Sequence, residues 1–368
     1  MGFKCGIVGL PNVGKSTLFN ALTNASVSAE NYPFCTVEPN LGVVPVPDER
    51  LAPLAEITNK SKVIPSTMEF VDIAGLVEGS SRGEGLGNQF LSHIRDVDAI
   101  AHVVRCFDDP NVSHLTADGR DAGHDVALIN MELILADLAT AVRAEAHMRN
   151  IARAGTRDDK ARLAALQKCV NALDGNEPLR SLKLGPNELA FLSDYRFLTL
   201  KPVMVVANVG ENEVHRGGEA EFLAEVAVKE SAAFVRVCSK LEAEIGQLDT
   251  AQEREEFREM ADMKESGLAR VVRTGYRLLN LHHFFTIGPD EVRAWTIPIG
   301  ATAPTAAGKI HTDFERGFIR AEVADFDTFV ANGGDAGCRK LGLMRSEGKD
   351  YVVADGDVVH FLFNVKPD

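Results

Sequence analysis

The sequence predicts an α/β fold in which a doubly wound, mostly parallel sheet is followed by a smaller α+β domain. Three observations lead to this expectation. A phosphate-loop motif lies between an apolar strand and a helix near the N-terminus, and short apolar runs then alternate with helical patterns. After about residue 280 the composition changes to short strands and turns. The chain of 368 residues is long enough for two or three domains with separate cores.

Residues 9–17 match the phosphate-loop pattern G-x-x-x-x-G-K-[ST] in full, after an apolar strand at 5–8 and before a helix through 18–22. Gly9 and Gly14 let the backbone turn its N–H groups toward phosphate oxygens. Lys15 brings a positive charge to the phosphates, and Ser16 offers a hydroxyl to Mg²⁺. The alternative is a glycine turn that happens to precede a helix. The nucleotide-binding residues expected here are Asn12, Val13, Gly14, Lys15, Ser16 and Thr17.

Four further apolar runs suit buried strands of a parallel sheet, at 68–72, 99–104, 203–208 and 234–237. Helical patterns lie between them, for example at 87–96 and 219–229. Residues 268–279 are apolar at helical spacing and are expected to close this domain. We therefore predict a nucleotide-binding domain over 1–127 and 201–280.

An Ala-rich segment at 128–200 interrupts the strand–helix alternation. Apolar residues step by three and four in two runs, and residues 155–159 separate the runs. This pattern predicts an inserted helical hairpin, and two surface helices packed on the sheet are the alternative. The runs are Leu128, Met131, Leu135, Leu138 and Val142, then Leu163, Leu166, Val170 and Leu173. The tip between them is basic, which indicates either a solvated face or an RNA contact: Arg143, His147, Arg149, Arg153, Arg157, Lys160 and Arg162.

Residues 281–368 predict a compact α+β domain. Short strands are expected at 294–299, 317–323, 350–353 and 358–363, with a short helix at 305–311. Its cations either contact rRNA phosphates or are scattered solubilising charges: Lys309, Arg316, Arg320, Arg339, Lys340, Arg345 and Lys349.

Residues that could respond to a γ-phosphate follow the phosphate loop. Asp72 ends a strand, and in P-loop proteins an Asp at this place holds Mg²⁺, commonly through water. The backbone N–H of Gly75 can contact the γ-phosphate. Thr36 lies between the two motifs and can complete the Mg²⁺ shell from a loop that responds to nucleotide. The position just after Gly75, where Ras-like proteins place a water-orienting Gln, holds Leu76. The expected metal ligands are thus Ser16, Thr36 and Asp72.

The base-reading position follows the strand at 203–208. GTPases read guanine there with Asn-Lys-x-Asp, whereas this chain has Asn208, Val209, Gly210 and Glu211. Glu is one methylene longer than Asp, and Val lacks the Lys stem that packs on the base. Adenine lacks the two guanine donors, so a site without a matched carboxylate favours adenine. Ser239 lies in the expected last base-contacting loop. Expected base contacts are therefore Asn208, Val209, Glu211 and Ser239.

Charge and cysteine usage limit the class of protein. The formal net charge of −14 argues against nonspecific nucleic-acid binding over the whole surface, and we expect no DNA partner. Six cysteines are scattered without a C-x-x-C pair, as in a reduced, cytoplasmic protein. No apolar run has the length of a membrane span, and the first strand leaves no room for a signal peptide, so neither a membrane partner nor export is expected.

The motifs together resemble the YchF family of Obg-related P-loop ATPases. The matching segments are the phosphate loop, 31–39, 72–76, 83–94 and 208–211, and in the C-terminal region 293–298, 300–304 and 308–314. The resemblance implies an OBG-type G domain, an inserted antiparallel coiled coil and a ubiquitin-like (β-grasp) TGS domain. It also implies Mg²⁺-dependent ATP hydrolysis with weak intrinsic activity and association with the ribosome and its large subunit.

A polar side chain must replace the absent Gln, because Leu76 cannot orient water. Two histidines are candidates by position: His93, inside a helix, and His114, on a polar loop that could reach the γ-phosphate. On residue type alone, a solvated loop residue is the better interpretation of His114. The family resemblance reverses this and implies that His114 is catalytic, together with Lys15. Two rival functions remain: a GTPase with relaxed base reading, and a non-catalytic ribosome-binding module with a structural nucleotide.

Overall fold

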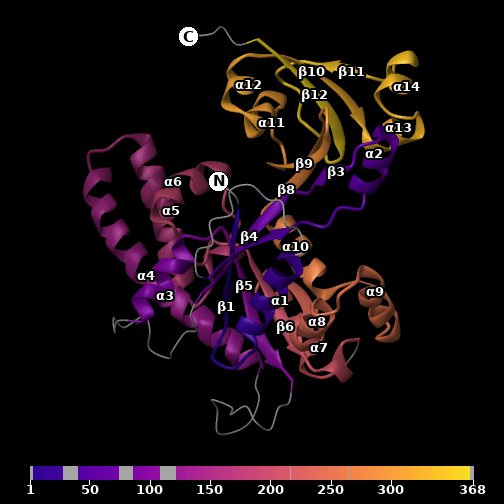
Figure 1. Ribbon diagram of the computed structural model, residues 1–368. Coiled ribbons are helices and arrows are strands. Elements are labelled where there is room, and N and C mark those ends of the chain that lie inside the picture. Colours follow the sequence, from indigo (N-terminus) through magenta and orange to yellow (C-terminus); the bar gives the residue numbers. More distant parts are fainter. Residues whose placement is uncertain are drawn as a thin grey trace. The chain divides into compact units, whose positions relative to one another are not determined.

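The structure is a computed structural model that describes residues 3–27, 40–73, 86–107, 122–215, 217–263 and 265–364 (Figure 1). The chain forms two compact units. The first comprises Met1–Val44 and Glu69–Leu278, and the second comprises Pro45–Met68 and Leu279–Asp368.

The expected domain boundaries differ from these units in one segment. Residues 45–68 were expected within the nucleotide-binding domain, but they belong to the second unit. Helix α2 (Leu51–Thr58) buries Leu51 and Leu54 in one apolar cluster with Phe285. Strand β3 (Lys62–Ile64) pairs in parallel with β9 (Glu291–Pro298). These contacts connect segments more than 200 residues apart, which no local sequence pattern can indicate.

The first unit is built on a six-stranded sheet in the order β2-β4-β1-β5-β6-β7. The pairs β1–β4, β1–β5, β5–β6 and β6–β7 are parallel, as expected for a doubly wound fold. All residues of β5 and β6 are buried, as expected from their largely apolar sequences, and the buried residues include His102, Arg105 and Asn208. The strands are β1 (Lys4–Val8), β2 (Leu41–Pro45), β4 (Thr67–Asp72), β5 (Ala99–Cys106), β6 (Val203–Val209) and β7 (Ala233–Val237).

Helices surround this sheet in the first unit. One buried cluster joins β5 and β6 to the start of α4 and to α7 and α8, through residues such as Val126, Leu223 and Ile245. The helices outside the hairpin segment are α1 (Lys15–Val27), α3 (Leu86–Arg95), α7 (Glu219–Lys229), α8 (Ser239–Gly246), α9 (Ala251–Met260) and α10 (Gly267–Leu278).

The inserted hairpin consists of α4 (Ala122–Ala152) and α5 (Arg157–Asp174), followed by η2 (Leu179–Ser181), α6 (Pro186–Leu192) and η3 (Ser193–Tyr195). Helix α5 begins inside the expected break because Thr156 and Asp159 form a capping box. The hairpin has its own core, which includes Leu166 and Leu173 as predicted.

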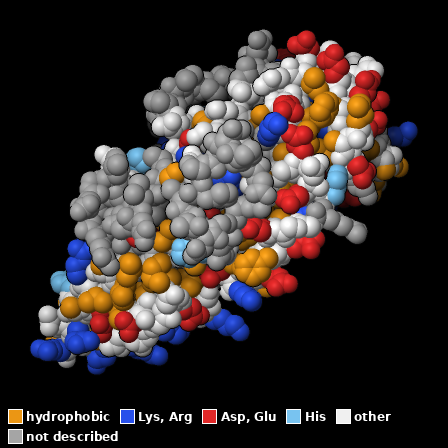
Figure 2. Space-filling model, turned by 90° about the horizontal axis from the view of Figure 1, so that it is seen from below, with side chains coloured by type: hydrophobic (Ala, Val, Ile, Leu, Met, Phe, Trp, Pro, Cys, Tyr) orange, Lys and Arg blue, Asp and Glu red, His pale blue; other side chains and the backbone are white. Residues whose placement is uncertain are grey.

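The buried face of α4 is not the one that the apolar spacing indicated. Ile134, Ala141 and Met148 enter the hairpin core at intervals of seven residues. Met131 and Val142 are 41% and 46% exposed instead. The helix is apolar around much of its circumference, so spacing alone does not choose the buried face. Figure 2 shows apolar side chains at the surface on the left, the side on which α4 and α5 lie in Figure 1.

The second unit contains a mixed six-stranded sheet in the order β11-β10-β12-β8-β9-β3. Strands β8 and β12 are parallel, whereas β8–β9, β10–β12 and β10–β11 are antiparallel. Helix α11 packs in the core beneath β9 and β10, which is consistent with the expected β-grasp arrangement. The remaining elements are β8 (Leu281–Ile287), α11 (Ala303–Ile310), α12 (Thr312–Arg316), β10 (Phe318–Asp325), α13 (Phe326–Ala331), α14 (Asp335–Lys340), β11 (Arg345–Glu347) and β12 (Asp357–Phe363).

Two further sequence predictions can be compared with the described residues. The strand expected at 350–353 is reduced to a single bridge between Thr302 and Val352. The described cysteines are free and buried, as expected, and Cys35 lies outside the described residues. Among the described residues, no helix combines the length and apolarity that a membrane span requires.

Candidate functional site

The phosphate loop connects β1 to α1 and has the backbone that an anion site requires. Asn12 and Gly14 adopt positive φ angles of 65° and 85°, so consecutive N–H groups can turn to one side. A Cβ on Gly14 would overlap the Asn208 amide. Gly9 has a different role from the predicted one, because its φ is not positive. A Cβ at Gly9 would lie 2.6 Å from the carbonyl oxygen of Val103, so close packing on β5 requires glycine there.

Lys15, Ser16 and Asp72 converge at the start of α1, although 56 or more residues separate Asp72 from the other two. Lys15 Nζ donates to Asp72 Oδ1, and Ser16 Oγ donates to Asp72 Oδ2 at 3.5 Å. The side chains of Lys15 and Asp72 are 12% and 15% exposed. The predicted phosphate-binding cation and the predicted metal-binding carboxylate therefore form one partly buried ion pair.

The donor set at this end fits a hard cation. Ser16 and Asp72 supply oxygen atoms, the ligand type that Mg²⁺ prefers. Within the described part of the chain, no group of three or more His, Cys, Asp or Glu side chains could hold a metal ion. A cation at Ser16 and Asp72 would thus complete its shell with phosphate oxygens and water, as Mg²⁺ does in phosphoryl-transfer sites.

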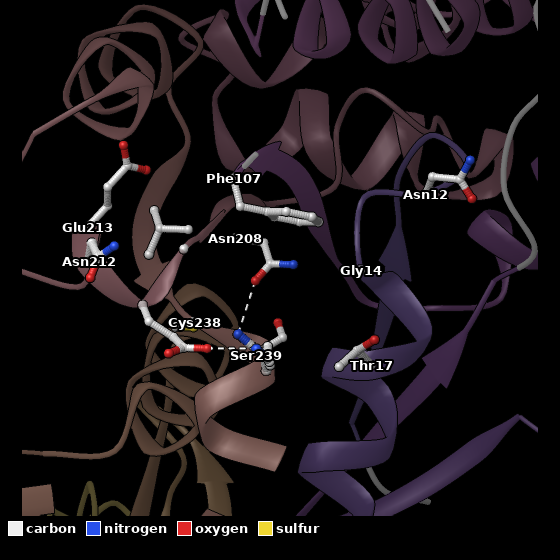
Figure 3. Close-up of a pocket in the computed structure, with 13 residues that line it drawn as sticks. Asn12, Gly14, Thr17, Phe107, Asn208, Asn212, Glu213, Cys238 and Ser239 are labelled. Atoms are coloured by element: carbon white, nitrogen blue, oxygen red, sulfur yellow. Dashed lines mark hydrogen bonds and ion pairs between the residues drawn. The ribbon is translucent and has the colours of Figure 1, made fainter. Parts of the chain in front are cut away.

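A cavity of about 820 Å³ lies beside the phosphate loop (Figure 3). Its walls come from the phosphate loop and from segments that follow the carboxyl ends of β5, β6 and β7, which is where α/β sheets bind ligands. The lining residues are Asn12, Gly14, Thr17, Phe107, Asn208, Val209, Gly210, Glu211, Asn212, Glu213, Cys238, Ser239 and Lys240.

Asn208 connects three of these segments. Its Nδ2 donates to the carbonyl of Val13 at 2.9 Å, and its Oδ1 accepts from the backbone N–H of Ser239 at 3.0 Å. The residue is 4% exposed, and Figure 3 shows it between Phe107 and Ser239. Because an amide has two donor hydrogens and two acceptor lone pairs, half of its capacity remains for a base. Asn208 therefore positions the loops around the pocket as well as lining it.

Glu211 lies at the position of the guanine-reading Asp, at the start of η4 (Glu211–Glu213), and it is paired with Lys240. Lys240 Nζ lies 2.8 Å from Glu211 Oε1, and the two side chains are 72% and 49% exposed. The hydrogen bond to Glu211 raises the pKa of Lys240. This carboxylate is therefore engaged by a cation from the first turn of α8 and does not stand alone as an acceptor for guanine.

Ser239 begins α8 at the edge of the pocket. The residue is 1% exposed, and its Oγ is buried without a hydrogen-bond partner among the described residues. A buried hydroxyl without a partner costs free energy, on the order of 1–3 kcal/mol, that a bound ligand could recover. This supports its predicted place in the base site.

Phe107 is the aromatic residue of the pocket, and like Gly210, Asn212 and Glu213 it was not among the expected site residues. It directly follows β5, and the guanidinium of Arg105 lies 4.8 Å from the centre of its ring. Arg105 Nε also donates to the carbonyl of Phe107 at 3.2 Å. An aromatic residue at the carboxyl end of a central strand was the available signal, because such strand ends border ligand sites in this fold class.

Several predicted site residues cannot be placed. Thr36, Gly75, Leu76 and His114 lie outside the described residues. His93 is described, and it lies on the exposed side of α3. The structure thus brings together the predicted residues of the phosphate loop, Asp72 and the base loops.

Two family profiles match different parts of the chain. The profile of the 50S ribosome-binding GTPase family, MMR_HSR1, matches residues 4–168. The profile YchF-GTPase_C, described as a protein of unknown function (DUF933), matches residues 281–364. The first match lies mostly in the first unit but includes residues 45–68 of the second, and the second match lies within the second unit.

Similar proteins align over the full length. The ribosome-binding ATPase YchF of Escherichia coli O157:H7 is 55% identical over 365 residues, which is 99% of this chain and 100% of that protein. The Bacillus subtilis protein of the same name is 47% identical with the same coverage. A solved structure, the Schizosaccharomyces pombe YchF GTPase, has a TM-score of 0.89 and 35% identity over 98% of both chains. This chain therefore belongs to the YchF family.

Proposed function

We propose that this chain is an ATPase that converts ATP to ADP and phosphate and acts as a nucleotide switch on the ribosome. Its relatives from E. coli and B. subtilis carry the name ribosome-binding ATPase. The observation that carries the proposal is the pocket beside the phosphate loop, whose base end pairs Glu211 with Lys240. Guanine would there meet a Glu that is one methylene longer than the usual Asp and is paired at the surface with Lys240, whereas adenine needs no carboxylate.

A GTPase is the rival function, and the printed title of the S. pombe relative names that activity. The non-catalytic module is the other rival, but a purely structural nucleotide would not need both Ser16 and Asp72 beside Lys15. The test is turnover of ATP and GTP, alone and with ribosomes. We expect slow ATP hydrolysis that ribosomes accelerate. GTP as the better substrate would favour the GTPase, and no turnover under any condition would favour the module.

Mg²⁺ is the proposed cofactor. The hydroxyls of Ser16 and Thr36 would hold the ion, with Asp72 bonded through water. When bound, the ion neutralises charge on the β- and γ-phosphates. Ser16→Ala is expected to remove most of the Mg²⁺ dependence of ATP affinity in calorimetry with and without a chelator. An unchanged dependence would contradict the assignment of Ser16.

The nucleotide-dependent element of the proposal is the loop at 31–39, with Thr36, and Gly75 as a γ-phosphate contact. Thr36→Ala is expected to leave ADP affinity intact while removing the difference in protease sensitivity between the ATP and ADP forms. If the variant retains that difference, Thr36 is not the switch residue.

His114 is the proposed catalytic residue that replaces Gln, acting with Lys15. An imidazole with a pKa near 6.5 can hydrogen-bond the attacking water and position it. His114→Ala is expected to reduce turnover about tenfold or more and to change ATP affinity less than about threefold, as for an interaction made in the transition state. His93→Ala is the control, since His93 lies exposed on α3. A loss confined to the control would transfer the role to His93.

The ribosome contact is proposed to involve the large subunit, through the TGS domain or the hairpin tip. Three cations of the C-terminal domain are already engaged by carboxylates: Arg320 by Glu322, Arg339 by Glu322 and Asp335, and Arg345 by Asp357. At the tip, Arg153, Arg157 and Lys160 are exposed, and Figure 2 shows Lys and Arg side chains gathered on that side. We therefore expect these tip cations to contribute more than the three engaged cations, although the C-terminal domain also exposes Lys309, Arg316, Lys340 and Lys349.

The proposed organisation is a nucleotide domain, an inserted coiled coil and a TGS domain in a cytoplasmic protein. Charge reversal at the tip, Arg153→Glu with Arg157→Glu, is expected to weaken ribosome co-sedimentation more than Arg339→Glu does. Equal or opposite effects would favour the TGS surface.

A further inference from the structure

A second cavity of the first unit, of about 600 Å³, has four arginines among its ten lining residues. Arg236 comes from β7, and Arg270, Arg273 and Arg277 come from α10. Glu265 and His215 also border it. None of these residues lines the nucleotide pocket, so the cavity is a separate feature of the molecule.

The three α10 arginines share one face of the helix. Their spacing of three and four residues places them in a stripe, while Val271, Val272 and Tyr276 are buried on the other side. From Arg270 to Arg277 the stripe rises seven residues, or about 10 Å along the helix axis. It therefore extends beyond the size of a single phosphate group.

The positive charge of this cavity is largely uncompensated by its own walls. Arg273 is paired with Glu265. Arg270 Nη2 donates to the carbonyl of Arg236 at 3.1 Å, and Arg236 Nη1 donates to the carbonyl of Glu213 at 3.5 Å. Those two acceptors are neutral, so only one lining carboxylate faces four guanidinium groups.

One donor inside the cavity also lacks an acceptor. Arg270 Nε is buried, and the described residues offer it no hydrogen-bond partner. Leaving a charged donor buried without an acceptor is costly, and an anion at this position would relieve that cost. Guanidinium groups suit phosphate, because two parallel N–H donors match two phosphate oxygens.

We propose that this arginine cavity binds backbone phosphates of ribosomal RNA when the protein is on the ribosome. The inference rests on the proposed ribosome-binding function and adds a contact surface to it. The length of the stripe favours a chain of phosphates over one free anion. In a protein with a net charge of −14, a local cationic cavity also favours RNA contact at one place rather than over the whole surface.

The test compares two double variants by co-sedimentation with ribosomes over a range of salt concentrations. Arg273→Gln with Arg277→Gln removes two charges from the cavity. Lys183→Gln with Lys229→Gln removes two exposed charges from the same unit and serves as the matched control. Arg236 and Arg270 are left unchanged, because their bonds to Glu213 and Arg236 could affect folding.

The cavity variant is expected to bind ribosomes about tenfold more weakly. The slope of log affinity against log salt should fall by about 1.5, because two phosphate contacts each contribute roughly 0.7–0.9. ATP affinity and basal turnover should stay within about twofold of the wild type. Arg277→Glu, at an exposed position, should reproduce the loss without a change in thermal stability.

Three results would overturn the inference. If the cavity variant binds ribosomes as well as the control variant does, the cavity is not an RNA contact, and the proposed function is unaffected. If the wild type binds pyrophosphate tightly and only the cavity variant loses this binding, while ribosome binding is unchanged, the cavity binds a small anion instead of RNA. Failure of the wild type to bind ribosomes would overturn both this inference and the proposed function.

Discussion

The phosphate half and the base half of the nucleotide pocket are built in different ways. One continuous segment, residues 9–17, forms the phosphate half, with left-handed turns at Asn12 and Gly14. The base half is assembled from the ends of β5, β6 and β7, and Asn208 joins two of its segments to the phosphate loop. Phosphate binding can therefore be carried by a local motif, whereas base choice depends on the tertiary structure.

The two halves also hold their ion pairs in different environments. The Lys15–Asp72 pair is mostly buried, whereas the Lys240–Glu211 pair is exposed. Exposed pairs contribute little and are screened by salt, whereas a charge left alone after truncation of a buried pair is costly. Substitutions in the phosphate half should thus have larger effects than those in the base half.

The largest effect is expected for Lys15→Ala. This change removes the phosphate-binding cation and leaves Asp72 without its partner, so ATP turnover should fall by about 100-fold or more. The matched change in the base half, Lys240→Ala, should alter turnover less than about threefold, since its pair is exposed. Steady-state phosphate release measures both. A comparable loss of turnover in the two variants would contradict the proposal that the phosphate half is the more sensitive of the two.

Asn208→Ala should have the next largest effect. It removes two buried hydrogen bonds that fix the phosphate loop to the Ser239 loop, each worth about 1 kcal/mol. Affinity for ATP, GTP and ADP should therefore fall together, by about tenfold. Calorimetry with the three nucleotides checks this. A loss confined to ATP would show that Asn208 reads the base directly and does not act mainly by positioning.

A smaller effect is expected from releasing the carboxylate of the base half. Glu211→Asp combined with Lys240→Ala supplies a shorter, unpaired carboxylate, and GTP affinity should rise a few-fold while ATP affinity changes little. Val209→Lys is not added to this pair, because Val209 is 2% exposed within an apolar cluster. Unchanged GTP affinity would show that the Lys240 pair does not limit guanine binding.

The last variant concerns stability and the strand between the two halves. His102 of β5 pairs in register with Val8 of β1 and Val205 of β6. Burial, assisted by the charge of Arg180, lowers the pKa of His102 to about 3. The unfolded chain binds a proton near pH 6.5 and the folded chain does not, so stability is complete above that pH and falls below it.

Urea unfolding at pH 7 and pH 5 measures this dependence. The loss is expected to reach about 1.4 kcal/mol per pH unit below pH 6.5. His102→Asn, which cannot take up a proton, should show a smaller difference between the two pH values. Equal pH dependence in both proteins would mean that His102 is not responsible.

Local signals in the sequence predicted the phosphate loop, the buried strands and the existence of the hairpin. They could not predict that α2 and β3 join the second unit, because those contacts are formed with strands more than 200 residues away. They also did not predict the buried face of α4, where alanines and large apolar residues occur around much of the helix. Phe107 was missed for a related reason: only the parallel order of β1, β5 and β6 brings its strand end beside the phosphate loop.

The most direct test of the base half is a side-by-side titration of the wild-type protein with ATP and GTP. Each guanine donor left without an acceptor costs on the order of 1–3 kcal/mol, so ATP should bind at least about tenfold more tightly than GTP. Hydrolysis rates at saturating nucleotide should favour ATP as well. Equal affinities for ATP and GTP would contradict the conclusion that this pocket selects adenine.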